Sequence, residues 1–279
     1  MEYITMRNGT KVPMLGLGCY KSEEQEGVEA VKSAIEIGYR HIDTANFYEN
    51  EKYVGRGIRE SGIDREKLFV VSKIWPTSFK TPEVAIEYSM RALNIDYIDM
   101  YLLHWPSQNE YARNHAFETL LKYKEKGYFK EVGVSNFKKE HLEKLKETFG
   151  FYPMMNQIEI SPWLQKKEDY AFCQENDIVM TACVPFAKGN ILNDPKLVEI
   201  AEKHGKNVGQ VILRWLVQRG IIPLAKTVRK ERMLENIDIF DFELTDEDMQ
   251  LISDMNKDTS SFFSHYDPAT VEMICGLKR

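Results

Sequence analysis

The sequence lacks any long apolar run. None approaches the roughly 20 consecutive apolar residues of a membrane-spanning helix. Residues 1–7 contain no apolar core of the kind found in a signal peptide. We therefore expect neither a membrane span nor an export signal, and we expect a cytoplasmic protein.

Excess positive charge is also missing. The 37 Lys and Arg residues are outnumbered by 43 Asp and Glu residues, giving a net charge of −6. Neutralising phosphates requires a basic face, so this balance argues against a nucleic-acid partner. The four cysteines, Cys19, Cys173, Cys183 and Cys275, form no C-x-x-C pair and have no metal-ligand spacing. They fit reduced cytosolic thiols, and we expect no metal site.

The glycine-rich nucleotide motifs are absent as well. Gly16-Leu17-Gly18 has no glycine at position 21, and Gly55-Arg56-Gly57 has none at position 60. No P-loop occurs. A doubly wound sheet usually binds dinucleotides through Gly-x-Gly-x-x-Gly, so that fold is the less favoured alternative.

Short apolar strands do alternate with amphipathic helices from about residue 14 to 255. An Asn8-Gly9 pair between 3–6 and 11–14 predicts an N-terminal β-hairpin. The first strand of the alternation, 15–18, precedes a helix, and seven more strand–helix pairs follow: 40–44 with 50–61, 68–73 with 82–93, 98–103 with 113–126, 129–134 with 138–148, 154–160 with 166–176, 178–183 with 207–219, and 221–226 with 230–238. Eight such units predict a (β/α)₈ TIM barrel as a single domain over 1–279.

Helix boundaries are marked by particular residues. Ser22 with Gln25 reads as a capping box for the first helix, which Gly38 should end. An extra helix is expected at 194–204. Thr245-Asp246-Glu247-Asp248 should cap a final helix, with Leu244 and Met249 as a hydrophobic staple.

Four polar residues follow predicted strands: Asp43, Tyr48, Lys73 and His104. The carboxyl ends of parallel barrel strands converge on one mouth, where active sites form. A tyrosine that donates a proton at neutral pH needs a nearby cation to stabilise its phenolate, and Lys73 can be that cation. Asp43 can hold Lys73, and His104 can donate a hydrogen bond to a substrate oxygen. These roles suit carbonyl reduction.

Each of the four also has a plain structural interpretation. Asp43 can cap a turn, Tyr48 can be an ordinary loop residue, Lys73 can be solvated, and His104 can be a hydrogen-bonded core histidine. A Schiff-base aldolase with Lys73 as nucleophile is another possible function. A non-catalytic binding or regulatory protein on the same scaffold is a third.

The flanking motifs favour the enzyme. They are His41-Ile42-Asp43-Thr44-Ala45, Tyr48-Glu49-Asn50-Glu51, Ser72-Lys73-Ile74-Trp75, Leu102-Leu103-His104-Trp105-Pro106, Gly133-Val134-Ser135-Asn136-Phe137 and Asn156-Gln157-Ile158-Glu159. In this order the chain resembles the aldo-keto reductases throughout its length, in particular short bacterial members such as diketogluconate-type reductases. The resemblance implies that Tyr48 is the general acid, Lys73 tunes it, Asp43 supports Lys73 and His104 orients a small-molecule carbonyl substrate.

The resemblance also implies further sites. Tyr20, Trp75 and Trp105 match substrate-pocket positions, although aromatic residues are common in any core. Three polar residues match the contacts of the nicotinamide carboxamide, although they can also cap turns: Ser135, Asn136 and Gln157. A short loop at 107–114 suggests an open pocket, and the tail at 260–268 is expected over it. The resemblance implies a monomer.

A basic turn near the end of the chain suggests which nicotinamide cofactor is used. Several cations in 224–232 precede or open a helix, where they oppose the helix dipole, and a bound anion would remove that conflict. The resemblance assigns Lys226, Thr227 and Arg232 to a 2′-phosphate and Glu235 and Asn236 to adenine. The family more often has serine where Thr227 stands. We expect NADPH rather than NADH.

One position departs from the family. Where its members usually have Ala-Tyr-Ser-Pro-Leu, with an aromatic ring stacked on the nicotinamide, this chain has Ala182-Cys183-Val184-Pro185-Phe186. A thiol offers no stacking plane. Either the cofactor binds more weakly or another side chain fills the gap. A reactive Cys183 is disfavoured because no activating base is evident.

Overall fold

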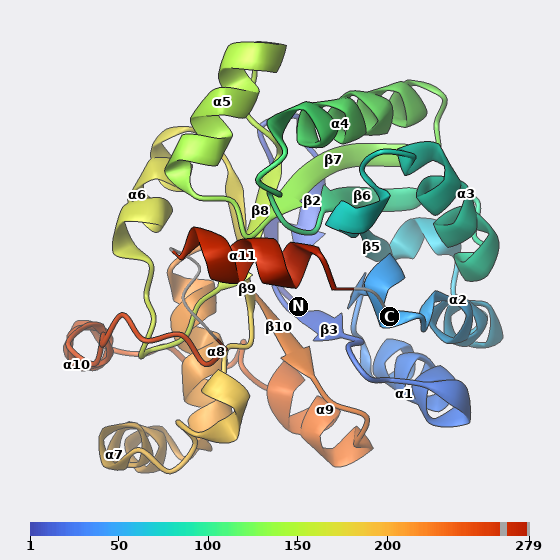
Figure 1. Cartoon of the computed structure of the whole chain (residues 1–279). Coiled ribbons are helices and arrows are strands. Elements are labelled where there is room, and N and C mark those ends of the chain that lie inside the picture. Colours follow the sequence, from blue (N-terminus) through green and yellow to red (C-terminus); the bar gives the residue numbers. More distant parts are fainter. Residues whose placement is uncertain (263–266, 278–279) are drawn as a thin grey trace.

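A closed barrel of parallel strands forms the centre of the protein (Figure 1), as a computed structural model describes it for residues 1–262 and 267–277. Within these residues eight strands pair in chain order, and the last pairs with the first: β3 (Gly16–Gly18), β4 (His41–Asp43), β5 (Phe69–Ile74), β6 (Ile98–Leu103), β7 (Phe129–Ser135), β8 (Met155–Glu159), β9 (Val179–Cys183) and β10 (Ile222–Lys226). The predicted (β/α)₈ barrel is confirmed, and the doubly wound alternative is wrong.

Helices surround the strands (Figure 1). The helices that follow successive strands are α1 (Glu24–Ile37), α2 (Glu51–Glu60), α3 (Pro82–Leu93), α4 (Glu110–Glu125), α5 (Lys139–Phe149), α6 (Lys167–Glu175), α8 (Val208–Gln218) and α9 (Lys230–Ile237). The extra helix before α8 is confirmed as α7 (Pro195–His204). After the barrel come α10 (Asp246–Ser253) and α11 (Pro268–Cys275), and the sequence pattern did not predict α11.

The predicted N-terminal hairpin is present as β1 (Tyr3–Thr5) and β2 (Lys11–Pro13), with Gly9 at φ 87° in its turn. Arg7 fastens this hairpin to the barrel. Its Nη1 donates to the backbone oxygens of Pro153, at 3.2 Å, and Asp177, at 3.1 Å, just before β8 and β9 begin. The hairpin therefore lies at the amino ends of the strands, opposite the mouth.

One predicted helix start is wrong. Glu23, not Ser22, is the N-cap residue of α1, and no side chain caps this helix. Ser22 is buried, and its backbone oxygen accepts a hydrogen bond from Asn50 Nδ2 at 3.1 Å. This tertiary contact fixes Ser22 outside the helix.

Two other predicted helix signals are confirmed. Gly38 ends α1 at φ 122°, a conformation that favours glycine. Thr245 Oγ1 accepts from the Asp248 backbone N–H at 3.2 Å, and Asp248 Oδ2 accepts from the Thr245 N–H at 3.0 Å. This reciprocal pair starts α10.

Strand β5 is buried along its whole length, because barrel strands face the interior on one side and helices on the other. Its buried residues include Lys73, which is 0% exposed. Burying an ammonium group is costly unless it is paired and hydrogen-bonded, so the partners of Lys73 are part of the fold as well as of the mouth.

Candidate active site

The four polar residues lie together at the carboxyl ends of neighbouring strands. Asp43 is the last residue of β4, Lys73 lies near the end of β5, and His104 directly follows β6. Tyr48 ends a short 3₁₀ turn (Asn46–Tyr48) in the loop between β4 and α2. The alternation of strands and loops thus brings residues from three parts of the sequence to one mouth.

Lys73 and Asp43 form a buried ion pair. Lys73 Nζ lies 2.5 Å from Asp43 Oδ1 and donates to the Thr44 backbone oxygen at 2.8 Å. The second Asp43 oxygen, Oδ2, accepts from Gln157 Nε2 at 2.8 Å. Both oxygens of Asp43 are therefore satisfied, and its capping interpretation does not apply.

Tyr48 lies close to both the ion pair and His104. Lys73 Nζ is 5.3 Å from the centroid of the Tyr48 ring, and the Tyr48 and His104 ring centroids are 5.6 Å apart. Tyr20 contacts Tyr48 edge-on, with ring centroids 5.0 Å apart. The structure therefore brings all four predicted residues, and Tyr20, into one cluster.

Burial sets the protonation states of this cluster. The pKa of Tyr48 is raised well above 10, first by burial and then by the Asp43 carboxylate. This direction is opposite to the predicted lowering by Lys73, because burial, the largest effect, disfavours the charged phenolate. Burial, followed by the Lys73 charge, lowers the pKa of His104 well below 6.5. At neutral pH the phenol therefore keeps its proton and the imidazole is neutral.

A chain of polar contacts runs beside the cluster at the ends of β7 and β8. Ser135 Oγ donates to the Gln157 backbone oxygen at 2.8 Å. Asn136 Nδ2 donates to the His104 backbone oxygen at 3.0 Å and to Ser135 Oγ at 3.1 Å. Asn136 holds φ 62°, a conformation that asparagine adopts more readily than most residues. Side-chain amides thus collect at one side of the mouth.

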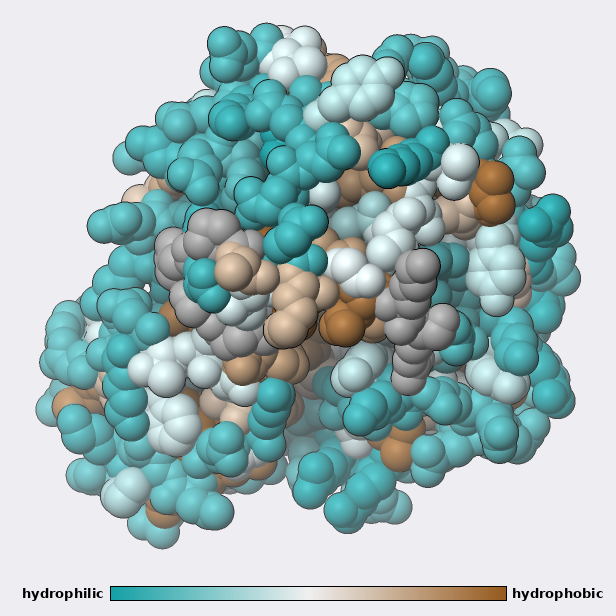
Figure 2. Space-filling view, in the orientation of Figure 1, coloured by the Kyte–Doolittle hydropathy of each residue, from teal (hydrophilic) through white to brown (hydrophobic). Residues whose placement is uncertain are grey.

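Aromatic side chains line the other side of the mouth. The Trp75 ring lies 4.9 Å from the His104 ring and stacks on Phe47 with a centroid separation of 3.8 Å. Trp75 and Trp105 form a small apolar cluster with Val271 and Cys275 of α11. In Figure 1, α11 lies across the mouth, and Figure 2 shows apolar side chains gathered at this part of the face. Helix α11 therefore packs against the two tryptophans at the mouth. Of the tail at 260–268 that is expected over the pocket, residues 263–266 lie outside the described residues.

The basic turn extends from the end of β10. Lys226 is exposed at the strand end, and Thr227 Oγ1 accepts the Arg229 backbone N–H at 3.1 Å. Arg232 and Glu235 are exposed on α9, and Asn236 is buried in the same helix. These five predicted cofactor residues lie along one short stretch of strand, turn and helix.

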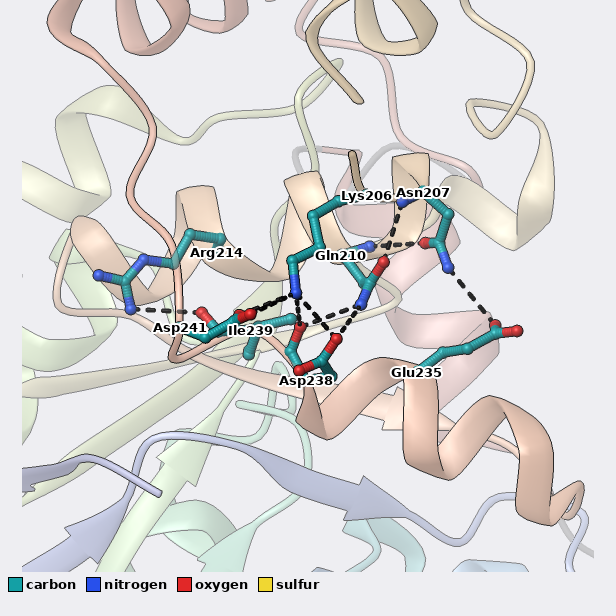
Figure 3. Close-up of polar contacts among 8 residues, drawn as sticks. All are labelled: Lys206, Asn207, Gln210, Arg214, Glu235, Asp238, Ile239 and Asp241. Atoms are coloured by element: carbon teal, nitrogen blue, oxygen red, sulfur yellow. Dashed lines mark hydrogen bonds and ion pairs between the residues drawn. The ribbon is translucent and has the colours of Figure 1, made fainter. Parts of the chain in front are cut away.

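A polar network fixes the end of α9 to the start of α8 (Figure 3). Lys206 Nζ donates to carboxylate oxygens of Asp238 and Asp241, each at 2.8 Å. Gln210 Nε2 donates to the Asp238 backbone oxygen at 3.0 Å. Asn207 Nδ2 reaches Glu235 at 3.5 Å. The network orders the helix that carries Arg232, Glu235 and Asn236.

Cys183 is the last residue of β9 and pairs in register with Glu159 of β8. Burial, followed by the Glu159 carboxylate, raises the pKa of the thiol to about 12. A thiol in that state is a weak nucleophile. The next residue, Val184, holds φ 54°, an uncommon and strained conformation for a β-branched side chain.

Comparison with known proteins decides the family. The Aldo/keto reductase family profile matches residues 9–257. The chain belongs to this family. A glyoxal reductase of Bacillus subtilis is 44% identical over 261 residues, which cover 92% of this chain and 94% of the relative. The methylglyoxal reductase DkgA of Escherichia coli is 33% identical over 256 residues, covering 91% and 93%.

Solved structures of aldo/keto reductases have the same fold as this chain. The enzyme MGS-M4, from a deep-sea metagenome library, superimposes with a TM-score of 0.91 at 36% identity, covering 95% of this chain and 98% of that one. The Bombyx mori aldo-keto reductase AKR2E4, solved in complex with NADP, gives a TM-score of 0.87 at 33% identity, covering 94% and 95%. Among the described residues, no helix combines the length and apolarity needed to cross a membrane.

Two parts of the mouth of this aldo/keto reductase were not predicted from the sequence. Phe47 stacks on Trp75, but its position in a three-residue turn gives no periodic signal. Val271 and Cys275 reach the tryptophans from α11. Their spacing of four residues was the available signal, since residues i and i+4 share a helix face.

Proposed function

We propose that this protein reduces aldehydes and ketones of small molecules to alcohols with NADPH. The observation that carries the proposal is the buried Lys73–Asp43 pair beside Tyr48, with the His104 ring edge-on to the Tyr48 ring. The same barrel holds NADP in the Bombyx mori relative. Relatives named for glyoxal and methylglyoxal reduction support a small carbonyl substrate.

The chain's own residues have distinct parts in this reaction. Bound NADPH supplies the hydride that reduces the carbonyl carbon. Tyr48 donates its phenolic proton to the carbonyl oxygen, and the proton is replaced from solvent. The neutral His104 donates a hydrogen bond that orients this oxygen. Lys73, held by Asp43, stabilises the negative charge that develops on Tyr48 as the proton leaves.

The residues beside the mouth fit the cofactor. Ser135, Asn136 and Gln157 present amide and hydroxyl groups that suit a carboxamide. Lys226, Thr227 and Arg232 suit a 2′-phosphate, because cations and a hydroxyl gather where α9 begins. Glu235 and Asn236 are assigned to adenine. We therefore propose NADPH in preference to NADH.

The function is tested by following NADPH oxidation at 340 nm with nitrobenzaldehyde, glyoxal and a panel of ketones and keto-sugars. We expect turnover with aldehydes, and a weaker response when NADH replaces NADPH. Binding of NADPH without turnover of any carbonyl would instead favour a non-catalytic member of the family. Trapping of a substrate adduct on Lys73 by borohydride would favour the aldolase.

Replacing Cys183 by tyrosine should tighten NADPH binding, because it restores a ring where the family stacks one on the nicotinamide. Stacking of a base on an aromatic side chain contributes about 1–3 kcal/mol, which corresponds to a dissociation constant lower by about 5- to 150-fold. Fluorescence titration with NADPH measures it. Cys183→Ala is the matched control, and we expect no tightening there. An unchanged dissociation constant for Cys183→Tyr would mean that another side chain already fills the gap.

We further propose that the protein is a monomer of one domain, that it acts in the cytoplasm and that it has no nucleic-acid partner. The net charge of −6 supports the last point. The free thiols of Cys19, Cys173, Cys183 and Cys275 suit a reducing compartment.

A further inference from the structure

The segment that follows α10 is fastened to the end of strand β8. Glu159, the last residue of β8, is 1% exposed. Its Oε2 accepts from Ser260 Oγ at 2.5 Å, and its Oε1 accepts from the Ser261 backbone N–H at 2.8 Å. Each carboxylate oxygen therefore receives a donor from the C-terminal segment.

These two hydrogen bonds are significant because the carboxylate is buried. A charged group removed from water is costly unless its oxygens receive donors, so loss of the segment from this position would leave Glu159 poorly satisfied. Glu159 lies two residues beyond Gln157, which bonds to Asp43, and pairs in register with Cys183. The fastening point is thus part of the mouth itself.

A second contact holds the same segment nearby. Lys188, in the loop after β9, places its Nζ 4.0 Å from the centroid of the Phe262 ring. A cation over an aromatic face is attracted by the ring's electron density. Residues 260–262 are therefore held by the end of β8 and by the loop that follows β9.

Beyond Phe262 the chain leads to α11 and the tryptophans. Val271 and Cys275 of α11 pack with Trp75 and Trp105, and Trp75 Nε1 donates to the Leu277 backbone oxygen at 3.0 Å. Asp267, which caps α11, is five residues after Phe262. Five residues span at most about 18 Å, so the position of 260–262 restricts where α11 can lie.

We propose that Glu159 is a positioning residue for the substrate pocket: by binding Ser260 and Ser261 it places α11 against Trp75 and Trp105. Glu159 touches neither substrate nor cofactor in this role and acts through the packing of α11. The effect on catalysis rests on the proposed function, because it requires that carbonyl substrates bind beside the two tryptophans. The effect on the position of α11 does not rest on the proposed function.

The test uses Glu159→Gln and Ser260→Ala in the full-length protein. Glutamine keeps the size of the side chain but removes the charge and replaces one acceptor with a donor. Alkylation of Cys275 by iodoacetamide, followed by peptide mass spectrometry without cofactor, reports the packing of α11, since Cys275 is the last residue of this helix and is only 6% exposed. Weakening the hydrogen bonds to the charged Glu159 carboxylate should favour the unpacked state of α11, in which Cys275 is accessible. We therefore expect alkylation of Cys275 to be about 10- to 100-fold faster in Glu159→Gln. We expect a smaller rise in Ser260→Ala.

Two controls make the result decisive. Cys173, buried in α6, reports general loosening and should keep its rate. Glu168→Gln changes an exposed carboxylate in the first turn of α6 and should leave Cys275 unaffected. Faster alkylation of Cys275 with Cys173 unchanged supports the proposal. The proposal is overturned if, in both variants, the alkylation rate of Cys275 is unchanged. It is also overturned if, in both variants, the rates of Cys275 and Cys173 rise equally.

Steady-state kinetics then separate the pocket from the chemistry. In Glu159→Gln we expect the KM for an aromatic aldehyde to rise about 10-fold, with kcat and the NADPH dissociation constant within twofold of the wild type. A fall in kcat at unchanged KM would overturn the positioning role. If the wild type reduces no carbonyl, the proposed function fails, while the alkylation result still decides whether Glu159 places α11.

Discussion

Replacing Tyr48 by phenylalanine should lower kcat for aldehyde reduction by roughly 10²- to 10⁴-fold, the usual contribution of a positioned proton donor. Phenylalanine keeps the ring that contacts Tyr20 and His104 but removes the hydroxyl. The NADPH dissociation constant should stay within twofold, because the cofactor residues are untouched. Stopped-flow measurement of NADPH oxidation together with fluorescence titration separates the two effects.

Tyr53→Phe is the matched control for Tyr48→Phe. Tyr53 lies on α2, where its ring contacts Lys52, and it has no part in the proposed reaction. Removing its hydroxyl should leave kcat close to that of the wild type. If Tyr48→Phe retained kcat within tenfold of the wild type, Tyr48 could not be the main proton donor.

Replacing Lys73 by methionine should reduce both turnover and stability. Methionine fills a similar volume but leaves the Asp43 carboxylate, 3% exposed, without its cation. Breaking one side of a buried ion pair typically costs about 3–5 kcal/mol, and we expect a loss of that order in the free energy of unfolding. Turnover should fall by at least about 10²-fold, because charge on Tyr48 is no longer stabilised. Urea unfolding and steady-state kinetics measure the two effects.

The double variant Lys73→Met, Asp43→Leu separates stability from catalysis. With both charges removed, no Asp43 carboxylate is left without its cation, so much of the lost stability should return. Turnover should not return, because the cation beside Tyr48 is still missing. Recovery of turnover in the double variant would show that Lys73 serves folding alone.

The barrel and the four polar residues could be predicted because each depends on local pattern. Strand and helix periodicity marked the eight units, and position at a strand end marked Asp43, Lys73 and His104. Features that depend on distant contacts could not be predicted in this way. Ser22 has the sequence pattern of a helix cap, but the Asn50 side chain binds its backbone oxygen and Ser22 lies outside the helix. The protonation of Tyr48 follows from burial, which spacing does not reveal.

The tail illustrates the same limit. The four-residue spacing of Val271 and Cys275 is a weak helical signal on its own, so the sequence pattern did not predict α11. The ties from Glu159 to Ser260 and Ser261 join positions about a hundred residues apart, and nothing local marks such a pair. The resemblance to the family indicated where the tail would lie but not what holds it there.

The hairpin that Arg7 fastens beneath β8 and β9 has a consequence for how such a protein can change. The residues at the amino ends of the strands, where the hairpin lies, are different from the residues at the mouth that contact a substrate. Mutations around Trp75, Trp105 or α11 can therefore be sampled without disturbing the end that keeps the strands together. A lineage, or a directed-evolution campaign, can explore new substrates at one end while foldability is preserved at the other.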